Sequence, residues 1–253
     1  TVRTRGVVDT APLLERDFAR QAGLGWIGKN TLLLNRKWGS WFFLAALLLD
    51  CELEFDPEFS AEYCGTCTAC LDACPTDAFA APFVLDATRC ISYLTIELRD
   101  PVPVDLRAAV GDRVFGCDTC QDVCPWNRKP DRSVDEVFEP VPSFDPLELA
   151  PLFELSDDAF RARFRRSPIW RVRRRGLLRN AAIVLGNRAN PVDLPILNRG
   201  LHDSEPLVRG AAAWAIGQLG TEPAREALND RLAVETDSTV RNEIAGGLGV
   251  DAR

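Results

Sequence analysis

The sequence lacks methionine and has no apolar segment long enough to cross a membrane. Its longest apolar run, residues 41–49 (WFFLAALLL), is about half of the roughly 20 residues that a membrane-spanning helix needs. No secretory signal opens the chain. The short apolar runs predict no membrane-spanning helix, and 253 residues are enough for one or two globular domains. The absence of a signal says little about localisation. Because an initiator methionine is missing, we expect the chain to be a fragment that lacks an N-terminal segment.

Acidic residues predominate in the chain but are absent from one segment. The formal net charge is -7, yet residues 159–192 contain ten arginines and no acidic residue. An acidic protein with one concentrated basic segment indicates a polyanionic partner that binds at a defined place. A solvated, arginine-rich helix face would give the same composition, so composition alone leaves both interpretations open.

Nine cysteines are present, and four of them lie close together. Residues 64–75 read CGTCTACLDACP and contain Cys64, Cys67, Cys70 and Cys74. A disulfide framework is a poor explanation, because thiols at this spacing are better placed to hold a metal. Structural zinc, which takes separated Cys-x2-Cys pairs, is the second alternative. The C-x2-C-x2-C-x3-C-P run is typical of ferredoxins with two 4Fe–4S clusters, in which the fourth cysteine binds the other cluster.

A reciprocal cysteine set follows downstream, as this pattern requires. The segment CDTCQDVCP repeats the Cys-Pro ending, and one further cysteine lies upstream of it. We therefore predict cluster one on Cys64, Cys67, Cys70 and Cys124, and cluster two on Cys74, Cys90, Cys117 and Cys120. The ninth cysteine, Cys51, ends an apolar run and is expected in the core.

The N-terminal region predicts a helix followed by strands. Residues 13–22 have a helical pattern that ends at Gly23. The next segment, GLGWIGKN, partly matches a dinucleotide-binding turn and a P-loop. It follows a helix and precedes an apolar run, and Asn30 replaces the magnesium-binding hydroxyl, so a nucleotide site is not favoured. Residues 31–49 are expected to form two buried strands joined by a polar turn at residues 35–40.

The C-terminal region predicts helical repeats. The segments LLRNAAIVLG, LVRGAAAWAIG and TVRNEIAGGLG place Arg179, Arg209 and Arg241 at intervals of 30 and 32 residues. Alanine-rich helices at such a period are typical of a helical solenoid, which we describe as HEAT-like. A solenoid usually serves as a binding surface, and no catalytic motif lies in this one.

Several motifs, in order along the chain, resemble the epoxyqueuosine reductase family. They are VVDTAPLLER, AGLGWIGKN, the first cysteine run, RCISYLTIE at 89–97, GCDTCQDVCPWN at 116–127 and SPIWRVRRRGLLRN at 167–180. The resemblance covers essentially the whole chain. The motifs are specific in combination, because generic ferredoxins lack both the displaced Cys90 and RCISYLTIE.

The resemblance implies an α+β protein in four parts. These are a remnant of an α/β cobalamin-binding domain (1–56), a ferredoxin-like module with two 4Fe–4S clusters (57–130), a linker (131–158) and an all-α, HEAT-like, tRNA-binding tail (159–253). The family's N-terminal segment, which contributes much of the cobalamin pocket, is missing. The resemblance also implies a cytoplasmic monomer that takes electrons from an external low-potential donor.

In this family, epoxyqueuosine in tRNA is reduced to queuosine, the last step of queuosine formation, with electrons passing through the clusters to cobalamin. Asp9 matches the family's proton donor. Val7, Val8 and Ala11 provide an apolar setting that would raise the pKa of its carboxyl group. From the local sequence alone, capping of a helix that starts at Pro12 is the favoured role of Asp9.

The resemblance implies two further sets of site residues. Those predicted to approach cobalamin are Asp9, Lys29, Ser92, Cys117 and Asp118. Those predicted to contact the anticodon loop of queuosine-family tRNA are Trp170, Arg171, Arg173 and Arg174. Arginine forks bind phosphates, and an indole can stack on an unpaired base. An ordinary surface lysine is the alternative for Lys29, and a core anchor is the alternative for Trp170.

Two other functions share parts of this pattern. A reductive dehalogenase also combines cobalamin with two clusters, but it would not need the arginine segment or the repeats. A ferredoxin-type electron carrier would need neither Asp9 nor a solenoid, and it would be much shorter.

Overall fold

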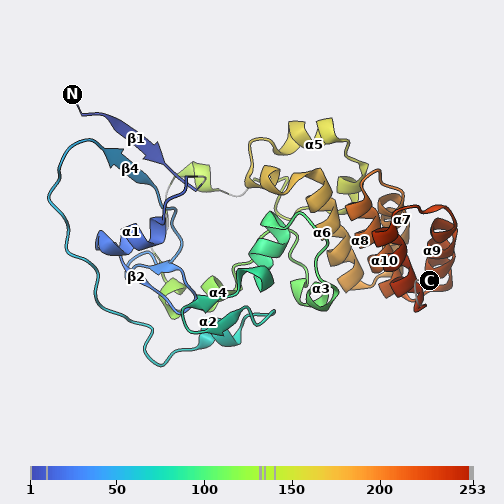
Figure 1. Ribbon diagram of the computed structural model, residues 1–253, viewed down its shortest axis with the longest axis horizontal. Coiled ribbons are helices and arrows are strands. Elements are labelled where there is room, and N and C mark those ends of the chain that lie inside the picture. The colour runs from blue at the N-terminus through green and yellow to red at the C-terminus, as the bar shows by residue number, and fades with distance from the viewer. Residues whose placement is uncertain (1, 10, 131–132, 134, 140, 251–253) are drawn as a thin grey trace. The chain divides into compact units, whose positions relative to one another are not determined.

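The computed structural model describes residues 2–9, 11–130, 133, 135–139 and 141–250 (Figure 1). The chain forms two compact units, each built from two separate stretches. Unit 1 consists of Thr1–Asp86 and Asp118–Glu139, and unit 2 consists of Ala87–Cys117 and Pro140–Arg253. The predicted division into four parts stays a prediction. The structure adds that the chain passes from one unit to the other within the predicted ferredoxin-like module.

Unit 1 contains short strands and short helices joined by long stretches without regular structure. Its elements are β1 (Thr4–Val7), α1 (Glu15–Gln21), β2 (Trp26–Ile27), β3 (Leu33–Leu34), β4 (Ala46–Leu49), α2 (Ala69–Asp72), β5 (Phe79–Ala81), β6 (Val84–Leu85), α4 (Thr119–Asp122), η3 (Pro125–Asn127) and η4 (Glu136–Phe138). The predicted helix is present as α1, slightly shorter at both ends.

The strands pair differently from the sequence prediction. The expected hairpin over residues 31–49 is wrong, because β3 pairs with β2 and β4 pairs with β1, each pair antiparallel. Glycine explains the first pairing. A Cβ atom on Gly25 would lie 2.0 Å from the carbonyl oxygen of Leu34, so only glycine allows this approach. The glycine-rich segment is therefore a tight hairpin rather than a phosphate-binding turn.

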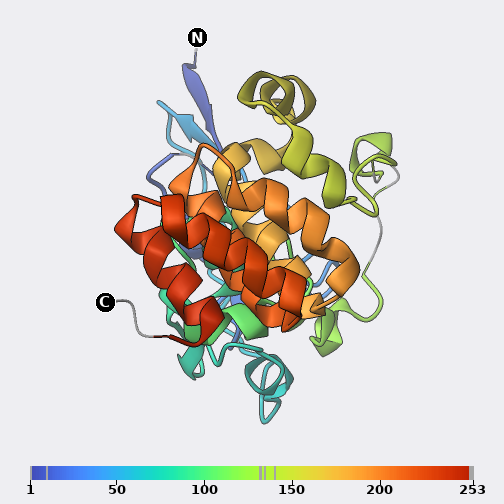
Figure 2. The same cartoon turned by 90° about the vertical axis from the view of Figure 1, so that its right-hand side faces the viewer.

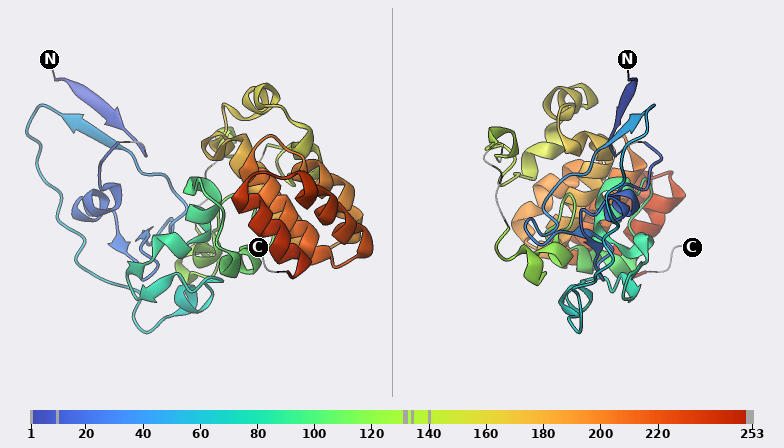
Figure 3. Two further views of the ribbon diagram at one scale, coloured as in Figure 1. Left: turned by 45° about the vertical axis from the view of Figure 1, so that its right-hand side comes forward. Right: turned by 90° about the vertical axis from the view of Figure 1, so that its left-hand side faces the viewer.

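Figure 3 shows the β1–β4 ribbon at the N-terminal end of the chain, and most of its side chains are exposed. Leu47 is 71% exposed, and Leu48 and Leu49 are also exposed. The expectation that this strand is buried is therefore wrong. Cys51, which follows the strand, is exposed as well, so its predicted place in the core is wrong. Two strands alone cannot cover both of their faces.

Unit 2 is largely helical. Its elements are η1 (Ala87–Arg89), the π-helix η2 (Tyr93–Glu97), α3 (Val104–Val110), η5 (Ala150–Glu154), α5 (Asp157–Phe164), η6 (Pro168–Val172), α6 (Arg173–Arg188), η7 (Pro191–Asp193), α7 (Leu194–Leu201), α8 (Pro206–Leu219), α9 (Glu222–Val234) and α10 (Ser238–Leu248). Figure 2 shows the helices of the repeat stacked side by side, with α8 packed between α6 and α10.

The repeat has a continuous apolar core. One cluster of buried side chains includes five that are completely buried: Leu177, Leu197, Val208, Ile216 and Ile244. Small residues bring the helices close together where they cross. A Cβ atom on Gly217 of α8 would lie 2.6 Å from the Cα atom of Gly247 in α10, so glycine is required at this crossing.

The end of the predicted linker is part of this core. Leu149, Leu152 and Phe153 are buried and pack in the same cluster as the repeat helices. Residues 131–132, 134 and 140 of the predicted linker lie outside the described part of the chain. The linker prediction thus covers a segment whose last residues help to build the solenoid.

The regularly spaced arginines form internal contacts in unit 2. Arg209 makes a two-pronged ion pair with Glu235, with N–O distances of 2.8 and 3.0 Å. Arg241 donates to the carbonyl oxygens of Leu232 and Glu235. Arg179 is only 1% exposed. Arg209 and Arg241 therefore join neighbouring parts of the repeat, whereas Arg179 binds the carbonyl oxygens of Leu94, Leu98 and Asp100.

Candidate metal centre

The four cysteines predicted to bind cluster one line a single cavity in unit 1. Cys64 and Cys67 lie in the loop before α2, Cys70 lies in α2, and Cys124 lies between α4 and η3. The cavity has a volume of about 240 Å³. Its other lining residues are Lys29, Asn30, Leu34, Tyr63, Pro125 and Trp126. Segments almost sixty residues apart in sequence thus bring their thiols to one place.

Two similar loops position these thiols. In the first loop, the Cys67 N–H donates to the Cys64 carbonyl oxygen at 3.0 Å and leads into the single turn of α2. In the second loop, the side-chain amide of Gln121 donates to Asp118 at 2.7 Å across the single turn of α4. The two short helices contact each other. A proline follows the last cysteine of each loop and prevents the helix from continuing.

Aromatic side chains form one wall of the site. Trp26 is 2% exposed, and its ring centroid lies 5.0 Å from those of Tyr63 and Trp126. Phe59 stacks on Trp26 at 5.8 Å. The Arg36 guanidinium covers the ring of Tyr63 at 4.1 Å. Of these rings, Tyr63 and Trp126 line the cavity itself, and their apolar surface lowers the local dielectric constant beside the thiols.

The thiols lie close enough together to influence one another's pKa. Burial raises the pKa of the Cys70 thiol, and neighbouring Cys124 and Cys64 raise it further. Burial also raises the pKa of the Cys124 thiol, with added effects of Cys64 and Cys67. In the described part of the chain, no three His, Cys, Asp or Glu side chains form a group that could hold a single metal ion. Four thiols around one cavity, of which Cys124 is buried, are the donor set of a 4Fe–4S cluster, and the residues fit that group.

The turn at Gly28–Asn30 connects the two cysteine loops. The Lys29 ammonium donates to the carbonyl oxygens of Gly65 at 2.7 Å and Cys67 at 3.0 Å. The side-chain amide of Asn30, which is buried, donates to the carbonyl oxygen of Cys120 at 3.4 Å. The sequence offered Lys29 only as a cobalamin contact or a surface lysine, and it did not reveal this contact. Its sole sequence signal was its place in a glycine-rich turn.

The ligands predicted for cluster two are divided between the units, and that assignment stays a prediction. Cys74 and Cys120 belong to unit 1, and Cys90 and Cys117 belong to unit 2. Within unit 2, the Ser92 hydroxyl accepts from the Cys117 N–H at 3.1 Å and donates to the Cys117 carbonyl oxygen at 3.2 Å. The motif RCISYLTIE therefore anchors the segment that carries Cys117. The predicted cobalamin contacts are also divided, with Asp9, Lys29 and Asp118 in unit 1 and the remainder in unit 2.

Asp9 lies in the loop after β1 and is exposed. Its φ angle is 40°, in the left-handed region that aspartate tolerates better than most residues. The helix-capping role is wrong, because α1 begins at Glu15 and has no side-chain hydrogen bond at its N-cap, Leu14. Of the residues expected to surround Asp9, Val7 is buried but Val8 is exposed. Thr10, the next residue of the motif, lies outside the described residues.

The predicted tRNA contacts lie around η6 and the start of α6. Trp170 packs against the core and stacks on Phe160 at 5.9 Å, as its alternative role as an anchor predicted. The Arg173 guanidinium covers the Trp170 ring at 4.1 Å. Arg171 pairs with Glu97 at 2.6 Å, and the Arg174 guanidinium pairs with Asp203. Their predicted contact with RNA stays a prediction, and Arg174 would have to compete with a partly buried ion pair.

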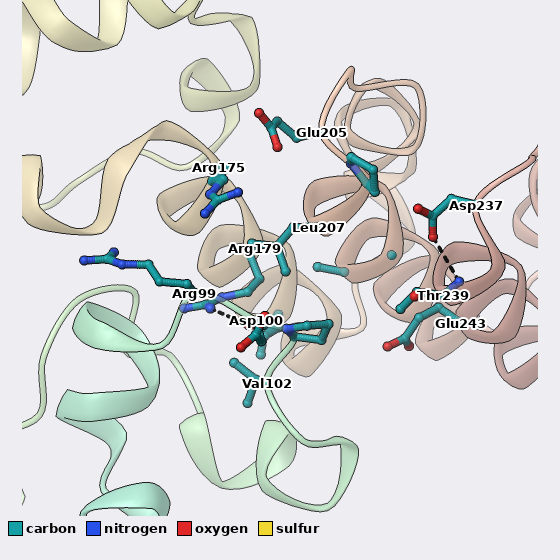
Figure 4. Close-up of a pocket in the computed structure, with 15 residues that line it drawn as sticks. Arg99, Asp100, Val102, Arg175, Arg179, Glu205, Leu207, Asp237, Thr239 and Glu243 are labelled. Atoms are coloured by element: carbon teal, nitrogen blue, oxygen red, sulfur yellow. Dashed lines mark hydrogen bonds between the residues drawn. The ribbon is translucent and has the colours of Figure 1, made fainter.

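A second cavity of about 260 Å³ lies in unit 2 (Figure 4). Arg99 and Arg175 lie at one end of it, and Asp237, Thr239 and Glu243 lie at the other. Arg179 reaches it with all its donors bonded to neutral oxygens: the carbonyls of Leu94, Leu98 and Asp100 and the Asn180 side chain. Burial, together with the nearby Arg99 and Arg107, lowers the pKa of Arg179 to about 10. Charges of both signs line this cavity, so it lacks the uniform polarity of an anion site.

Sequence families match both regions of the chain. Residues 63–127 match the 4Fe-4S double cluster binding domain, and residues 158–249 match HEAT repeats. The second match confirms the predicted HEAT-like tail. In the part of the chain that the structure describes, no helix has both the length and the apolar character needed to span a membrane.

Relatives with known structure or curated description match the chain. An epoxyqueuosine reductase from Pseudomonas aeruginosa is 50% identical over 221 residues, which cover 85% of this chain and 60% of that protein. A crystal structure of epoxyqueuosine reductase with an epoxyqueuosine-modified tRNA-Tyr stem loop has a TM-score of 0.93 and 38% identity, and the match covers 98% of this chain and 66% of that one. A Bacillus subtilis epoxyqueuosine reductase, described with an aspartate catalytic loop swung out of the active site, has a TM-score of 0.91 and 36% identity over the same shares.

The cysteine-lined cavity, the double-cluster match and the stacked repeats define an iron–sulfur protein with a HEAT-repeat tail. The relatives narrow this class further. The chain belongs to the epoxyqueuosine reductase family. It spans about three fifths of the length of the curated relatives that it matches.

Proposed function

We propose that this chain is the cluster-bearing and tRNA-binding portion of an epoxyqueuosine reductase, which reduces epoxyqueuosine in tRNA to queuosine. The observation that carries the proposal is a four-cysteine cavity and a HEAT-repeat tail in one chain. The chain also matches, over 98% of its length, a relative solved with its modified tRNA stem loop.

The reaction defines what the protein must supply. Removing the epoxide oxygen as water requires two electrons and two protons and leaves a carbon–carbon double bond. Two 4Fe–4S clusters, which we assign to the cysteine sets above, suit the delivery of single electrons. Cobalamin, which we propose the complete protein binds, would supply a low-valent cobalt centre that accepts these electrons. Asp9, Lys29, Asp118, Ser92 and Cys117 are the residues of this chain proposed to lie near it.

We assign Asp9 as the proton donor for the leaving oxygen. Its carboxyl group is exposed in a loop, so a substrate could approach it. An aspartate catalytic loop in the Bacillus subtilis relative supports this role. A bound corrinoid or nucleoside that covers Asp9 would exclude water from the carboxyl group and hold it beside the leaving oxygen, as general acid catalysis requires.

For RNA binding we propose the basic surface around η6. The Arg173 guanidinium covers the Trp170 ring, and Arg171 lies beside Trp170 in η6. Arg165 and Arg166, close by in sequence, are exposed. Arginine guanidinium groups bind phosphates, and this binding weakens as salt ions compete. The affinity for an epoxyqueuosine tRNA stem loop should therefore fall steeply with salt in a filter-binding titration, and a flat response would contradict this surface.

Replacing the proposed donor tests the function. In the complete protein, Asp9→Asn should reduce the conversion of epoxyqueuosine tRNA at least 100-fold, because a general acid typically contributes 10²–10⁴-fold. Iron and cobalamin contents should not change. Asp56→Asn, which removes an exposed carboxylate from the same unit, is the matched control. Full activity of Asp9→Asn would overturn the assignment of the donor.

Substrate choice separates the alternatives. A reductive dehalogenase would convert a halogenated substrate and ignore modified tRNA, and an electron carrier would bind no cobalamin. The basic segment and the HEAT match both favour the tRNA substrate. Conversion of a chlorinated aromatic compound, with none of the epoxyqueuosine tRNA, would contradict the proposed function.

A further inference from the structure

Lys29 has a position that the chain's other lysines do not share. The chain contains three lysines, and Lys37 and Lys129 are both exposed. Lys29 is partly buried and lines the cavity that Cys64, Cys67, Cys70 and Cys124 surround. A cation placed at this cavity is therefore a feature of the metal site and not of the general surface.

Two hydrogen bonds hold the ammonium group in place. It donates to the Gly65 and Cys67 carbonyl oxygens at 2.7 and 3.0 Å, and these belong to the loop that carries the first two thiols. An ammonium group has three N–H donors. Among the described residues its hydrogen bonds are these two, so one donor is left for a group bound in the cavity.

The backbone around Lys29 is also fixed. Its carbonyl oxygen accepts from the Phe83 N–H at 3.0 Å, and the Thr31 N–H donates to the Gly28 carbonyl oxygen at 2.8 Å. A Cβ atom on Gly28 would lie 2.6 Å from a methyl carbon of Leu34, so this glycine lets the turn sit close against β3. The side chain thus extends from a rigid turn, which limits the entropy lost when it reaches the loop.

A fixed positive charge here has an electrostatic consequence. Four thiolates give a bound cluster a net negative charge, which grows by one unit when the cluster accepts an electron. A nearby cation stabilises the more negative, reduced form more strongly than the oxidised form. Tyr63 and Trp126 line the cavity, and Trp26 packs against both; these rings strengthen the effect because they lower the local dielectric constant.

We propose that Lys29 is a positioning residue for the first cysteine loop, and that its charge raises the reduction potential of cluster one. The inference rests on the assignment of cluster one in the proposed function. In the redox step, dithionite gives up one electron and the cluster gains it, and no bond to the protein forms or breaks. The role is electrostatic and needs no proton transfer at Lys29.

The test compares two substitutions in the protein loaded anaerobically with iron and sulfide. Lys29→Gln keeps a hydrogen-bond donor but removes the charge, whereas Lys29→Arg keeps the charge. In a dithionite titration followed by electron paramagnetic resonance, Lys29→Gln should lower one of the two cluster midpoints. At a fixed potential the ratio of reduced to oxidised cluster should fall about tenfold, which equals about 59 mV for one electron. Lys29→Arg should stay near the wild-type midpoint, as should the charge-removing control Lys37→Gln.

Each other outcome also decides the matter. Unchanged midpoints in Lys29→Gln with full iron content would overturn the proposal. Loss of cluster one in Lys29→Gln but not in Lys29→Arg would support it, because both variants keep a hydrogen-bond donor and only Lys29→Arg keeps the positive charge. Loss in both variants would overturn it and leave Lys29 a purely steric support. The measurement is a reduction potential and does not depend on turnover of tRNA. A protein that shows the expected change in midpoint but does not convert epoxyqueuosine tRNA would therefore support the role of Lys29 and contradict only the proposed function.

Discussion

The two units of this chain obtain their order from different sources. Unit 2 has a continuous core in which Leu177, Leu197 and Ile216 are completely buried. Unit 1 has a small cluster of buried side chains around Trp26 and Cys124, and it exposes large apolar residues such as Phe55, which is 96% exposed. Unit 1 therefore has a much smaller apolar core than unit 2, and we expect a bound cluster to provide part of its order.

This difference indicates which changes each unit tolerates. A packed helical core holds its shape without a cofactor, and its stability follows buried apolar area. The stability of a unit with short elements and few buried side chains depends on cross-links or bound metals, and an iron–sulfur cluster is one such group. The units should therefore respond to opposite kinds of substitution.

The largest expected effect is the removal of a cluster-one ligand. Cys70→Ser should eliminate cluster one, so that iron content falls by about half if two equal clusters are bound. Amide hydrogen exchange, measured by mass spectrometry on the anaerobically loaded protein, should become much faster in peptides from residues 60–75 and 118–127. Peptides from α6, α8 and α10 should stay as protected as in the wild type.

The matched control for Cys70→Ser is another cysteine of the same unit. Cys51 is exposed and lies outside both predicted ligand sets. Cys51→Ser should leave both iron content and exchange unchanged. Equal protection of unit 1 in Cys70→Ser and Cys51→Ser would show that the cluster is not what orders unit 1.

A smaller effect should follow when a buried ion pair in unit 2 is broken. Glu235 binds Arg209 and Arg231, and its side chain is 1% exposed. Glu235→Gln leaves these guanidinium groups without a carboxylate and should lower the free energy of unfolding by about 3–5 kcal/mol. Chemical denaturation followed by circular dichroism measures this loss, and Glu226→Gln, an exposed position in α9, is the control.

The same residue predicts a pH dependence for unit 2. Burial alone would raise the pKa of Glu235, but hydrogen bonds from Arg209, the Asp237 N–H and Arg231 outweigh it and lower the pKa to about 2 from the usual 4.5. The carboxylate therefore contributes stability fully above about pH 4.5 and loses it as the pH falls towards 2. In Glu235→Gln this part of the acid sensitivity should disappear. An identical acid profile in both proteins would contradict the role of the ion pair.

The smallest expected effect tests how precisely the core of unit 2 is packed. Ile216 is fully buried in α8. Ile216→Val removes one methylene group and should cost about 0.5–1.5 kcal/mol in the free energy of unfolding, with iron content unchanged. Val192→Ala removes more carbon from a side chain that is 71% exposed and should cost less. A larger loss in Val192→Ala would break the contrast between packed and exposed positions.

Local patterns predicted the grouping of cysteines and the repeats. Cysteine spacing is set by the shape of a single loop, so the sequence alone could group Cys64, Cys67 and Cys70. The cavity then brings Cys124 to the same place. The alanine-rich period predicted the repeats because each helix must present a similar face to the next one.

Non-local choices escaped prediction. Strand partners are separated by up to 45 residues, and nothing in LLL or FFL specifies that β4 pairs with β1. From composition, arginines in a repeat suggest a basic surface. In the structure, Arg179 donates to backbone carbonyl oxygens and Arg209 binds the Glu235 carboxylate. Lys29 escaped for the same reason, because its acceptors lie 36 and 38 residues away.

The crossing of α8 and α10 has a consequence for the shape of the repeat. At Gly217 and Gly247 two backbones meet without side chains between them. In a stacked array, the rotation from one helix pair to the next sets the curvature of the whole surface. A methyl group on Gly217 would press on the Cα atom of Gly247 and push α8 and α10 apart, so one hydrogen atom at this crossing helps to set the curvature of the repeat.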